Sequence, residues 1–232
     1  MIVVAHRGCF GPACTENTLE AFSAALAIGA DGIELDLRLS KDGEIVIVHD
    51  ANLHRVAGDA HKVVELTAEE LADISLRHGG SIPTLADVTS HIHAPAILDL
   101  EIKHHDAVGL LIRKLHTSSS LRDRSIVSSF HAKSLLEIQT QVSGVRTLFL
   151  VPRWPLPLRD LGFWKKLSAL HPWGVAFPIS RLNARRVAKL KRLGFAVGAW
   201  DVRGRKAEAL KAQKLNLDLA IIRDISAVRS VS

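Results

Sequence analysis

The feature that most constrains this chain is a repeated alternation between short apolar runs and amphipathic segments with helical spacing. The first run covers 2–5, and the helical pattern after it places Leu19, Phe22 and Leu26 on one face before a second run begins at Gly32. A strand, a helix and a second strand in this order form the unit of a parallel sheet. Six further apolar runs follow, at 96–102, 125–130, 147–151, 174–178, 195–200 and 219–222.

Helical patterns separate these later runs, at 107–116, 132–142, 158–170, 182–193 and 206–215. Eight strand–helix units in one chain predict an α/β fold of the TIM (β/α)8 barrel type, in which eight parallel strands close into a cylinder. The length of 232 residues suits one such barrel, which typically takes about 250 residues. No linker rich in Pro, Gly or Ser divides the sequence, so we expect residues 1–232 to form a single domain.

The chain carries a net charge of +6 with a pI near 9.6, which favours an anionic partner or substrate. Much of the excess lies at 185–192 and 203–214, where apolar residues recur with helical spacing, so we interpret both stretches as solvated helix faces. Neither stretch resembles a nucleic-acid-binding motif, and we expect no nucleic-acid partner.

The first residues, 1–6, lack the basic start and the apolar run of a signal peptide. No apolar run approaches the ~20 residues of a membrane helix. Cys9 and Cys14 are the only cysteines, and we interpret them as reduced loop thiols rather than as a disulfide framework. A cytoplasmic protein without an integral membrane segment is expected.

A β-hairpin is predicted after the second strand, around the dipeptide Asp42-Gly43. A two-residue type I′ turn there would place Asp36 opposite His49, and directly opposed residues point to the same face of a sheet. Glu34 shares that face because it lies two residues from Asp36. The hairpin thus gathers two carboxylates and an imidazole, while its return arm is an antiparallel excursion outside the count of eight strands.

The segment 51–83 carries no convincing strand and is predicted to be a short insertion after the hairpin. It contains one helix, whose start is marked by Thr67 and Glu70 with the spacing of a capping box. The same spacing upstream predicts Asn17 as the N-cap of the first helix, with Glu20 at the third helical position.

Polar residues at the ends of predicted strands are the candidates for a site, because the active sites of TIM barrels lie at the carboxyl ends of the strands. Burying ionisable groups without partners costs several kcal/mol each, so a cluster of such groups inside a barrel indicates a functional site. Three adjacent strand ends and the hairpin carry the main candidates: His6, Arg7, Glu34, Asp36, His49, Glu101 and Lys103.

The residue types indicate the chemistry. The three carboxylates offer only oxygen ligands, which suit Mg²⁺ or Ca²⁺, whereas zinc would need a tight Cys/His spacing that the sequence lacks. Arg7 and Lys103 suit an anion beside that metal, most simply a phosphate. His6 and His49 suit a general acid and base pair acting across the phosphate.

Several short motifs keep a fixed order along most of residues 2–130. They are His6-Arg7-Gly8, Glu16-Asn17-Thr18-Leu19-Glu20-Ala21-Phe22, Gly29-Ala30-Asp31, Glu34-Leu35-Asp36, Lys41-Asp42-Gly43, His49-Asp50, Leu53-His54-Arg55, Ile82-Pro83-Thr84-Leu85, Glu101-Ile102-Lys103 and Ser129-Phe130. Together they closely resemble the glycerophosphodiester phosphodiesterase family, in the phosphatidylinositol-phospholipase-C-like superfamily of TIM barrels. The match weakens after residue 130.

The resemblance implies a barrel with its insertion at 51–83, and metal-dependent hydrolysis of a small-molecule glycerophosphodiester to sn-glycerol 3-phosphate and an alcohol. In the mechanism it implies, the substrate's 2-hydroxyl attacks phosphorus, activated by one histidine and the metal, while the other histidine protonates the leaving alcohol. Which histidine takes which role stays open. Carried onto matching positions, it assigns metal binding to Glu34, Asp36 and Glu101, acid/base catalysis to His6 and His49, and phosphate contacts to Arg7 and Lys103.

Two other functions stay open. The runner-up enzyme is a related phosphodiesterase acting on lysophospholipids, which an apolar loop at 152–158 with Phe163 and Trp164 would support, although packing of that loop onto the barrel is the preferred interpretation. The other is a catalytically silent phosphate-binding barrel, against which the retention of both histidines argues.

The last two strands depart from the family pattern at Arg203 and Arg223, which are candidates for altering the alcohol or glycerol end that is accepted. Three further residues are candidates for lining the pocket: Glu16, His131 and Trp200.

Overall fold

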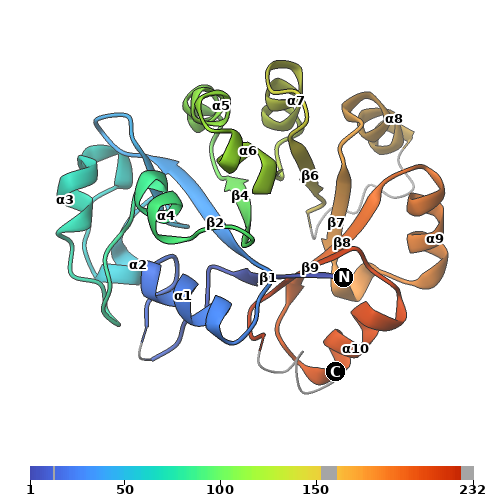
Figure 1. Cartoon of the computed structure of the whole chain (residues 1–232), viewed down its shortest axis with the longest axis horizontal. Coiled ribbons are helices and arrows are strands. Elements are labelled where there is room, and N and C mark those ends of the chain that lie inside the picture. Colours follow the sequence, from blue (N-terminus) through green and yellow to red (C-terminus); the bar gives the residue numbers. More distant parts are fainter. Residues whose placement is uncertain (13, 153–160, 226–232) are drawn as a thin grey trace.

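In the described parts of the chain, residues 1–12, 14–152 and 161–225 of a computed structural model, eight parallel strands form a closed barrel (Figure 1). They are β1 (Ile2–His6), β2 (Gly32–Leu39), β4 (Ile97–Ile102), β5 (Ser125–Ser129), β6 (Arg146–Leu150), β7 (Gly174–Pro178), β8 (Ala196–Val202) and β9 (Leu219–Ile222). Their order in the sheet follows the chain, and β1 closes the cylinder by pairing with both β9 and β2. The predicted TIM barrel is confirmed.

Helices surround the strands on the outside of the barrel (Figure 1). They are α1 (Leu19–Ala27), α4 (Leu85–His91), α5 (Val108–Thr117), α6 (Ser119–Arg124), α7 (Ala132–Gln141), α8 (Leu161–Leu170), α9 (Ala184–Arg192) and α10 (Lys206–Lys214). The sequence patterns did not predict α4 and α6, although each begins at a hydroxyl N-cap, Thr84 or Ser118, that accepts a backbone N–H. Among the described residues, no helix is both long and apolar enough to span a membrane.

Two apolar layers hold the barrel together. Outward-facing residues such as Leu35 of β2 join Phe22 of α1 in the layer between strands and helices. Inward-facing residues such as Val4, Ile126 and Leu148 fill the cylinder itself. All of them are buried, so the interior forms an apolar floor beneath the polar residues at the strand ends.

The hairpin after β2 is present, but its turn is one residue longer than predicted. Strand β3 (Ile45–Ile47) runs antiparallel to β2, with Ile45 opposite Leu39. In the turn, Gly43 adopts a φ of 81° and its N–H donates to the Ser40 carbonyl at 3.1 Å. This is the geometry of a turn closed by a left-handed glycine in a bulge, which adds one residue to the loop.

The longer turn shifts the register of the hairpin. The N–H of Val48 donates to the Asp36 carbonyl at 2.9 Å, so the predicted pairing of Asp36 with His49 is wrong by one residue. His49 lies beyond the end of β3, where its carbonyl accepts from Arg38 Nε at 2.8 Å. It therefore reaches the mouth of the barrel from outside the ladder.

The insertion between β3 and α4 forms a small unit with a core of its own. It contains α2 (His54–Ala57), the 3₁₀ turn η1 (Val63–Glu65) and α3 (Ala68–Ala72), and it lies beside α4 and the hairpin (Figure 1). The predicted capping box of α3 is confirmed, because Thr67 Oγ1 accepts from Glu70 N while Glu70 Oε2 accepts from Thr67 N. Apolar residues such as Leu53 and Leu71 bury this unit against Val46 and Val48 of the hairpin.

Candidate active site

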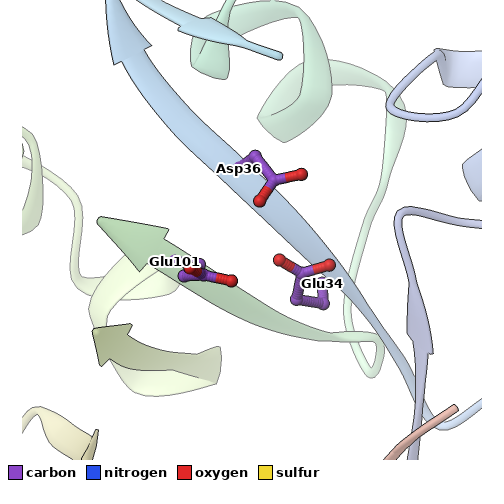
Figure 2. Close-up of side chains that lie close together, drawn as sticks. All are labelled: Glu34, Asp36 and Glu101. Carbon is purple, nitrogen blue, oxygen red and sulfur yellow. The ribbon is translucent and has the colours of Figure 1, made fainter. Parts of the chain in front are cut away.

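Three buried carboxylates converge where the middle of β2 runs beside the carboxyl end of β4 (Figure 2). Glu34 and Asp36 lie two residues apart on β2 and share its inner face, and Glu101 of β4 pairs directly with Asp36 in the parallel ladder. One oxygen from each residue lies within 4.8 Å of the other two. The strand register therefore brings together the three carboxylates that the sequence predicted as a cluster.

Two cations lie against these carboxylates. Arg7 follows β1 with a left-handed φ of 59°, which turns its Nε to within 3.0 Å of Asp36 Oδ2 while its backbone N–H donates to Glu34 at 3.0 Å. Lys103 Nζ lies 3.2 Å from Asp36 Oδ1 and 2.8 Å from Glu101 Oε1. Asp36 thus contacts both cations and forms the electrostatic centre of the site.

Asn17 completes the surroundings of Asp36 and corrects one prediction. The N-cap of α1 is Thr18, whose side chain accepts from Ala21 N, and not Asn17. Asn17 instead has a left-handed φ of 60° and donates from Nδ2 to Asp36 Oδ2 at 2.8 Å. The predicted N-cap lies one residue before the N-cap in the structure, and Asn17 is a polar contact of the site instead.

The three carboxylates differ in how readily they ionise. Burial alone would raise the pKa of Asp36, but Lys103 and Arg7 outweigh it and hold that pKa at about 2. Burial raises the pKa of Glu34 well above its usual range, and the charges of Asp36 and Glu101 raise it further. Burial also raises the pKa of Glu101. The site therefore carries more carboxylate than its own cations neutralise.

The donor set fits a hard divalent cation. Glu34 Oε1 is buried and has no hydrogen-bond partner among the described residues. An unpaired buried oxygen is costly unless something charged or polar meets it. Three carboxylates and no thiol are the ligand types that Mg²⁺ and Ca²⁺ take.

Two histidines lie beside this cluster. His6 ends β1, pairs with Glu34 in the ladder, and places Nε2 4.0 Å from Glu34 Oε2. His49 Nδ1 lies 2.7 Å from Asp50 Oδ1. Burial, and after it the charge of Arg7, lowers the pKa of His6 to about 3, and burial also lowers the pKa of His49. Both imidazoles are therefore neutral near pH 7 in the protein alone.

The tautomer of His49 follows from its partner. Hydrogen bonds from His49 and Arg55 lower the pKa of Asp50 against the effect of burial, so Asp50 is an ionised acceptor. Since a carboxylate only accepts, Nδ1 of His49 carries the proton and donates to it. The other ring nitrogen, Nε2, is then free to exchange a proton with a substrate.

Arg55 of α2 holds Asp50 and Glu16 in place. Its Nε lies 2.6 Å from Asp50 Oδ2, and its two terminal nitrogens donate to Glu16 at 2.7 and 2.9 Å. Glu16 also accepts from Arg7 at 2.9 Å. Sequence reasoning did not assign a role to Asp50 or Arg55, although both lie in the motifs His49-Asp50 and Leu53-His54-Arg55.

The clustered groups surround a cavity of about 320 Å³ at the mouth of the barrel. Trp200 lines it as predicted; its indole N–H donates to the Val151 carbonyl at 3.0 Å, and its ring meets Phe130 edge to face. The ionisable lining residues are His6, Arg7, Glu34, His49, Glu101, Lys103 and Asp201, and the apolar ones are Phe130, Leu150, Trp200 and Ile221.

Two predicted pocket residues lie elsewhere. Glu16 is buried behind Arg7 and does not line this cavity. His131 is exposed at the start of α7 and lies outside the cavity lining. The apolar loop proposed to receive a lipid chain lies outside the described residues from 153 to 158, while Phe163 is buried in the layer between barrel and helices.

Comparisons with known proteins agree with this geometry. A putative glycerophosphodiester phosphodiesterase of Bacillus subtilis is 30% identical over 231 residues, covering 94% of this chain and 92% of that protein. A glycerophosphodiester phosphodiesterase of Caldanaerobacter subterraneus is 29% identical, covering 96% of this chain and 94% of that protein. The crystal structure of the glycerophosphodiester phosphodiesterase of Thermotoga maritima superposes with a TM-score of 0.84 at 27% identity, covering 100% of this chain and 98% of that one.

The model of the glycerophosphoryl diester phosphodiesterase family matches residues 6–225, which include every residue of the carboxylate, histidine and cation cluster. The family resemblance inferred from the motifs is confirmed. This chain belongs to the glycerophosphoryl diester phosphodiesterase family.

Proposed function

We propose that this protein hydrolyses glycerophosphodiesters to sn-glycerol 3-phosphate and an alcohol, using Mg²⁺ or Ca²⁺. Family membership supports the reaction class. The observation that carries the proposal is the trio Glu34, Asp36 and Glu101 beside two cations and two histidines, with Glu34 Oε1 buried and without a hydrogen-bond partner among the described residues. The cavity of about 320 Å³ suits a small molecule rather than a polymer.

The three carboxylates would hold the divalent cation. When bound, such a cation supplies positive charge to a phosphate oxygen and makes a neighbouring hydroxyl more acidic. Because burial raises the pKa of Glu34 and Glu101, binding requires both to release their protons, and affinity should rise with pH.

Arg7 and Lys103 bind the phosphodiester in this proposal. Both side chains line the cavity and already point their charged ends toward its carboxylates. An anionic phosphate beside them stabilises their charge, and their fixed positions stabilise the charge that develops as phosphorus is attacked. Neither cation needs to move far, because each is held by two carboxylates.

His6 and His49 transfer the protons. One, as the neutral imidazole, takes the proton of the substrate's 2-hydroxyl as that oxygen attacks phosphorus. The other must first gain a proton when the anionic substrate binds, and it then gives this proton to the departing alcohol oxygen. Internal attack is favoured because nucleophile and phosphorus belong to one molecule. Water then opens the cyclic phosphate with the two roles exchanged. Asp50 supports this assignment for His49, because it holds Nδ1 and leaves Nε2 for the substrate.

The test is release of sn-glycerol 3-phosphate from glycerophosphocholine with Mg²⁺, with Ca²⁺, and after chelation. We expect turnover that EDTA abolishes and either cation restores; full activity in EDTA would contradict the metal assignment. A phosphocholine ester of 1,3-propanediol, which lacks the 2-hydroxyl, should not be cleaved. Its normal cleavage would show that water, and not the 2-hydroxyl, attacks first.

A further inference from the structure

A second cavity of about 270 Å³ lies beside the active site and has no role in the reaction described so far. Its walls come from the loop after β1, from the insertion after β3, and from the end of β9. We call it the arginine cavity, and its principal lining residues are Phe10, Glu16, Arg55, Arg77, His78 and Arg223.

The arginine cavity and the active site lie on opposite sides of a wall formed by the ion pair between Arg7 and Glu16. Arg7 lines the active site, and its guanidinium donates to Glu16, which lines the arginine cavity, at 2.9 Å. At β9, Ile221 lines the active site while Arg223, two residues further along the same strand direction, lines the arginine cavity. A molecule held in the active site can therefore extend over this wall.

The lining is positively charged and its charge is not neutralised. Arg223 lies 5.1 Å over the ring of Phe10, and Arg77 donates to the His54 carbonyl at 3.3 Å. Within the described residues, neither guanidinium has a carboxylate at ion-pair distance, and both side chains are exposed. Glu16, the acid in the lining, already accepts from both Arg7 and Arg55. Two guanidiniums thus face this space with their charge available, which suits a phosphate or carboxylate.

We propose that the arginine cavity binds an anionic group on the alcohol half of the substrate, so that the preferred diesters carry a phosphate or carboxylate on their leaving alcohol. This inference rests on the proposed function. In that reaction the glycerol half carries only hydroxyl groups, so a second anion can come only from the alcohol. The positions of Arg77 and Arg223 then make them residues that determine specificity.

The test compares glycerophosphoinositol 4-phosphate with glycerophosphoinositol, which differ by one phosphate on the alcohol half. We expect the wild-type kcat/KM to favour the phosphorylated substrate by roughly fivefold, the factor that corresponds to the ~1 kcal/mol that an exposed ion pair contributes at most. The double variant Arg77→Gln/Arg223→Gln should lose this preference and keep its turnover of glycerophosphoinositol. The matched control, Arg113→Gln/Arg192→Gln, removes the same charge from exposed positions on α5 and α9 and should keep the preference.

Absence of a preference in the wild type, or its survival in the Arg77→Gln/Arg223→Gln variant, would overturn the inference. If inorganic phosphate instead alters turnover of glycerophosphoinositol in the wild type but not in this variant, and no preference exists, the cavity takes a free anion and the assignment to the leaving alcohol is wrong.

Calorimetric binding of both diesters to EDTA-treated protein separates this inference from the proposed function. A binding preference that Arg77→Gln/Arg223→Gln abolishes supports the arginine cavity even if no diester is hydrolysed with metal present. Equal binding of the two diesters counts against the cavity even if both are hydrolysed.

Discussion

The two sides of the active-site cavity are built from different chemistry. Strands β1, β2 and β4, with the end of the hairpin, contribute a side lined by ionisable residues such as His6, Glu34 and Lys103, which we call the charged side. The strands from β5 onward contribute an apolar side formed mainly by Leu150, Trp200 and neighbouring residues, with Asp201 as the charged exception. Leu150 and Trp200 also belong to or pack on the apolar cluster that fills the barrel, so this side continues the core.

This difference assigns the reaction mainly to the charged side and the stability of the fold mainly to the apolar side. The charged side buries ionisable groups, which costs free energy unless they are paired. The ion pairs of Asp36 with Arg7 and Lys103 offset part of this cost. The apolar side stabilises the fold because its apolar surface is buried, and it contains almost no charges that need a partner. We therefore expect substitutions on the charged side to reduce rate, with a loss of stability only where a paired charge such as Asp36 is removed. Substitutions on the apolar side should reduce stability. Four predictions test this contrast.

The largest effect is expected from the histidines of the charged side. His6→Ala and His49→Ala should each reduce kcat by about 10²–10⁴-fold, the usual range for a general acid or base, with little change in Tm. The matched control is His131→Ala, which removes an exposed imidazole outside the cavity and should leave kcat unchanged. A near-normal rate in either folded variant would show that its imidazole transfers no proton.

The apolar side should respond in the opposite way. Leu150→Ala removes a side chain that is 2% exposed, and we expect a loss of about 2–5 kcal/mol in the free energy of unfolding, because a buried Leu leaves a cavity. Leu136→Ala on α7, where Leu136 is 47% exposed, is the matched control and should cost far less. Urea unfolding measures both. Equal losses in the two variants would mean that Leu150 is not part of a packed core.

Asp36 and Glu34 on the charged side should differ in what they contribute to the stability of the protein, although both support activity. Asp36 has a depressed pKa, so its ionised form stabilises the fold above about pH 4, and this contribution disappears as pH falls toward about 2. Asp36→Asn should therefore cost about 2–3 kcal/mol at pH 7 and less at pH 3. Glu34 has a raised pKa, so its ionisation opposes folding, and Glu34→Gln should not lower the stability of chelated protein at pH 7.

Thermal unfolding in EDTA at pH 3 and pH 7 checks this pair, with activity measured in parallel. Both variants should lose turnover in the presence of Mg²⁺. If Glu34→Gln destabilised the chelated protein as much as Asp36→Asn, the charged side would not contain the uncompensated carboxylate that we infer.

The smallest effect is expected from Arg55, which contacts the charged side only through Asp50 and Glu16. Arg55→Lys keeps the charge but loses the fork that binds both acids, and we expect about a tenfold loss in kcat. The ring ¹⁵N shifts of His49 should also show a mixture of tautomers, a change that simple destabilisation would not produce. Arg113→Lys on α5 is the control. An unchanged His49 tautomer in Arg55→Lys would show that Arg55 does not position His49.

Much of the site could be predicted from sequence because strand ends in a parallel barrel meet at one edge. Parity along 32–39 and 96–102 placed Glu34, Asp36 and Glu101 together, and the ladder confirms that Asp36 pairs with Glu101. The hairpin register was wrong because a turn with a bulged Gly43 and a two-residue turn share the dipeptide Asp42-Gly43.

The sequence by itself determined the alternation of strands and helices, the barrel that eight such units form, and the polar residues at its strand ends. These follow from periodicity, which is local. Only the tertiary structure decided that Asn17 contacts Asp36 rather than capping α1, that Arg55 joins Asp50 to Glu16, and that one side of the cavity is apolar. Those contacts join elements up to 39 residues apart, and their geometry depends on backbone conformations such as the left-handed φ of Arg7 and Asn17 that only packing selects.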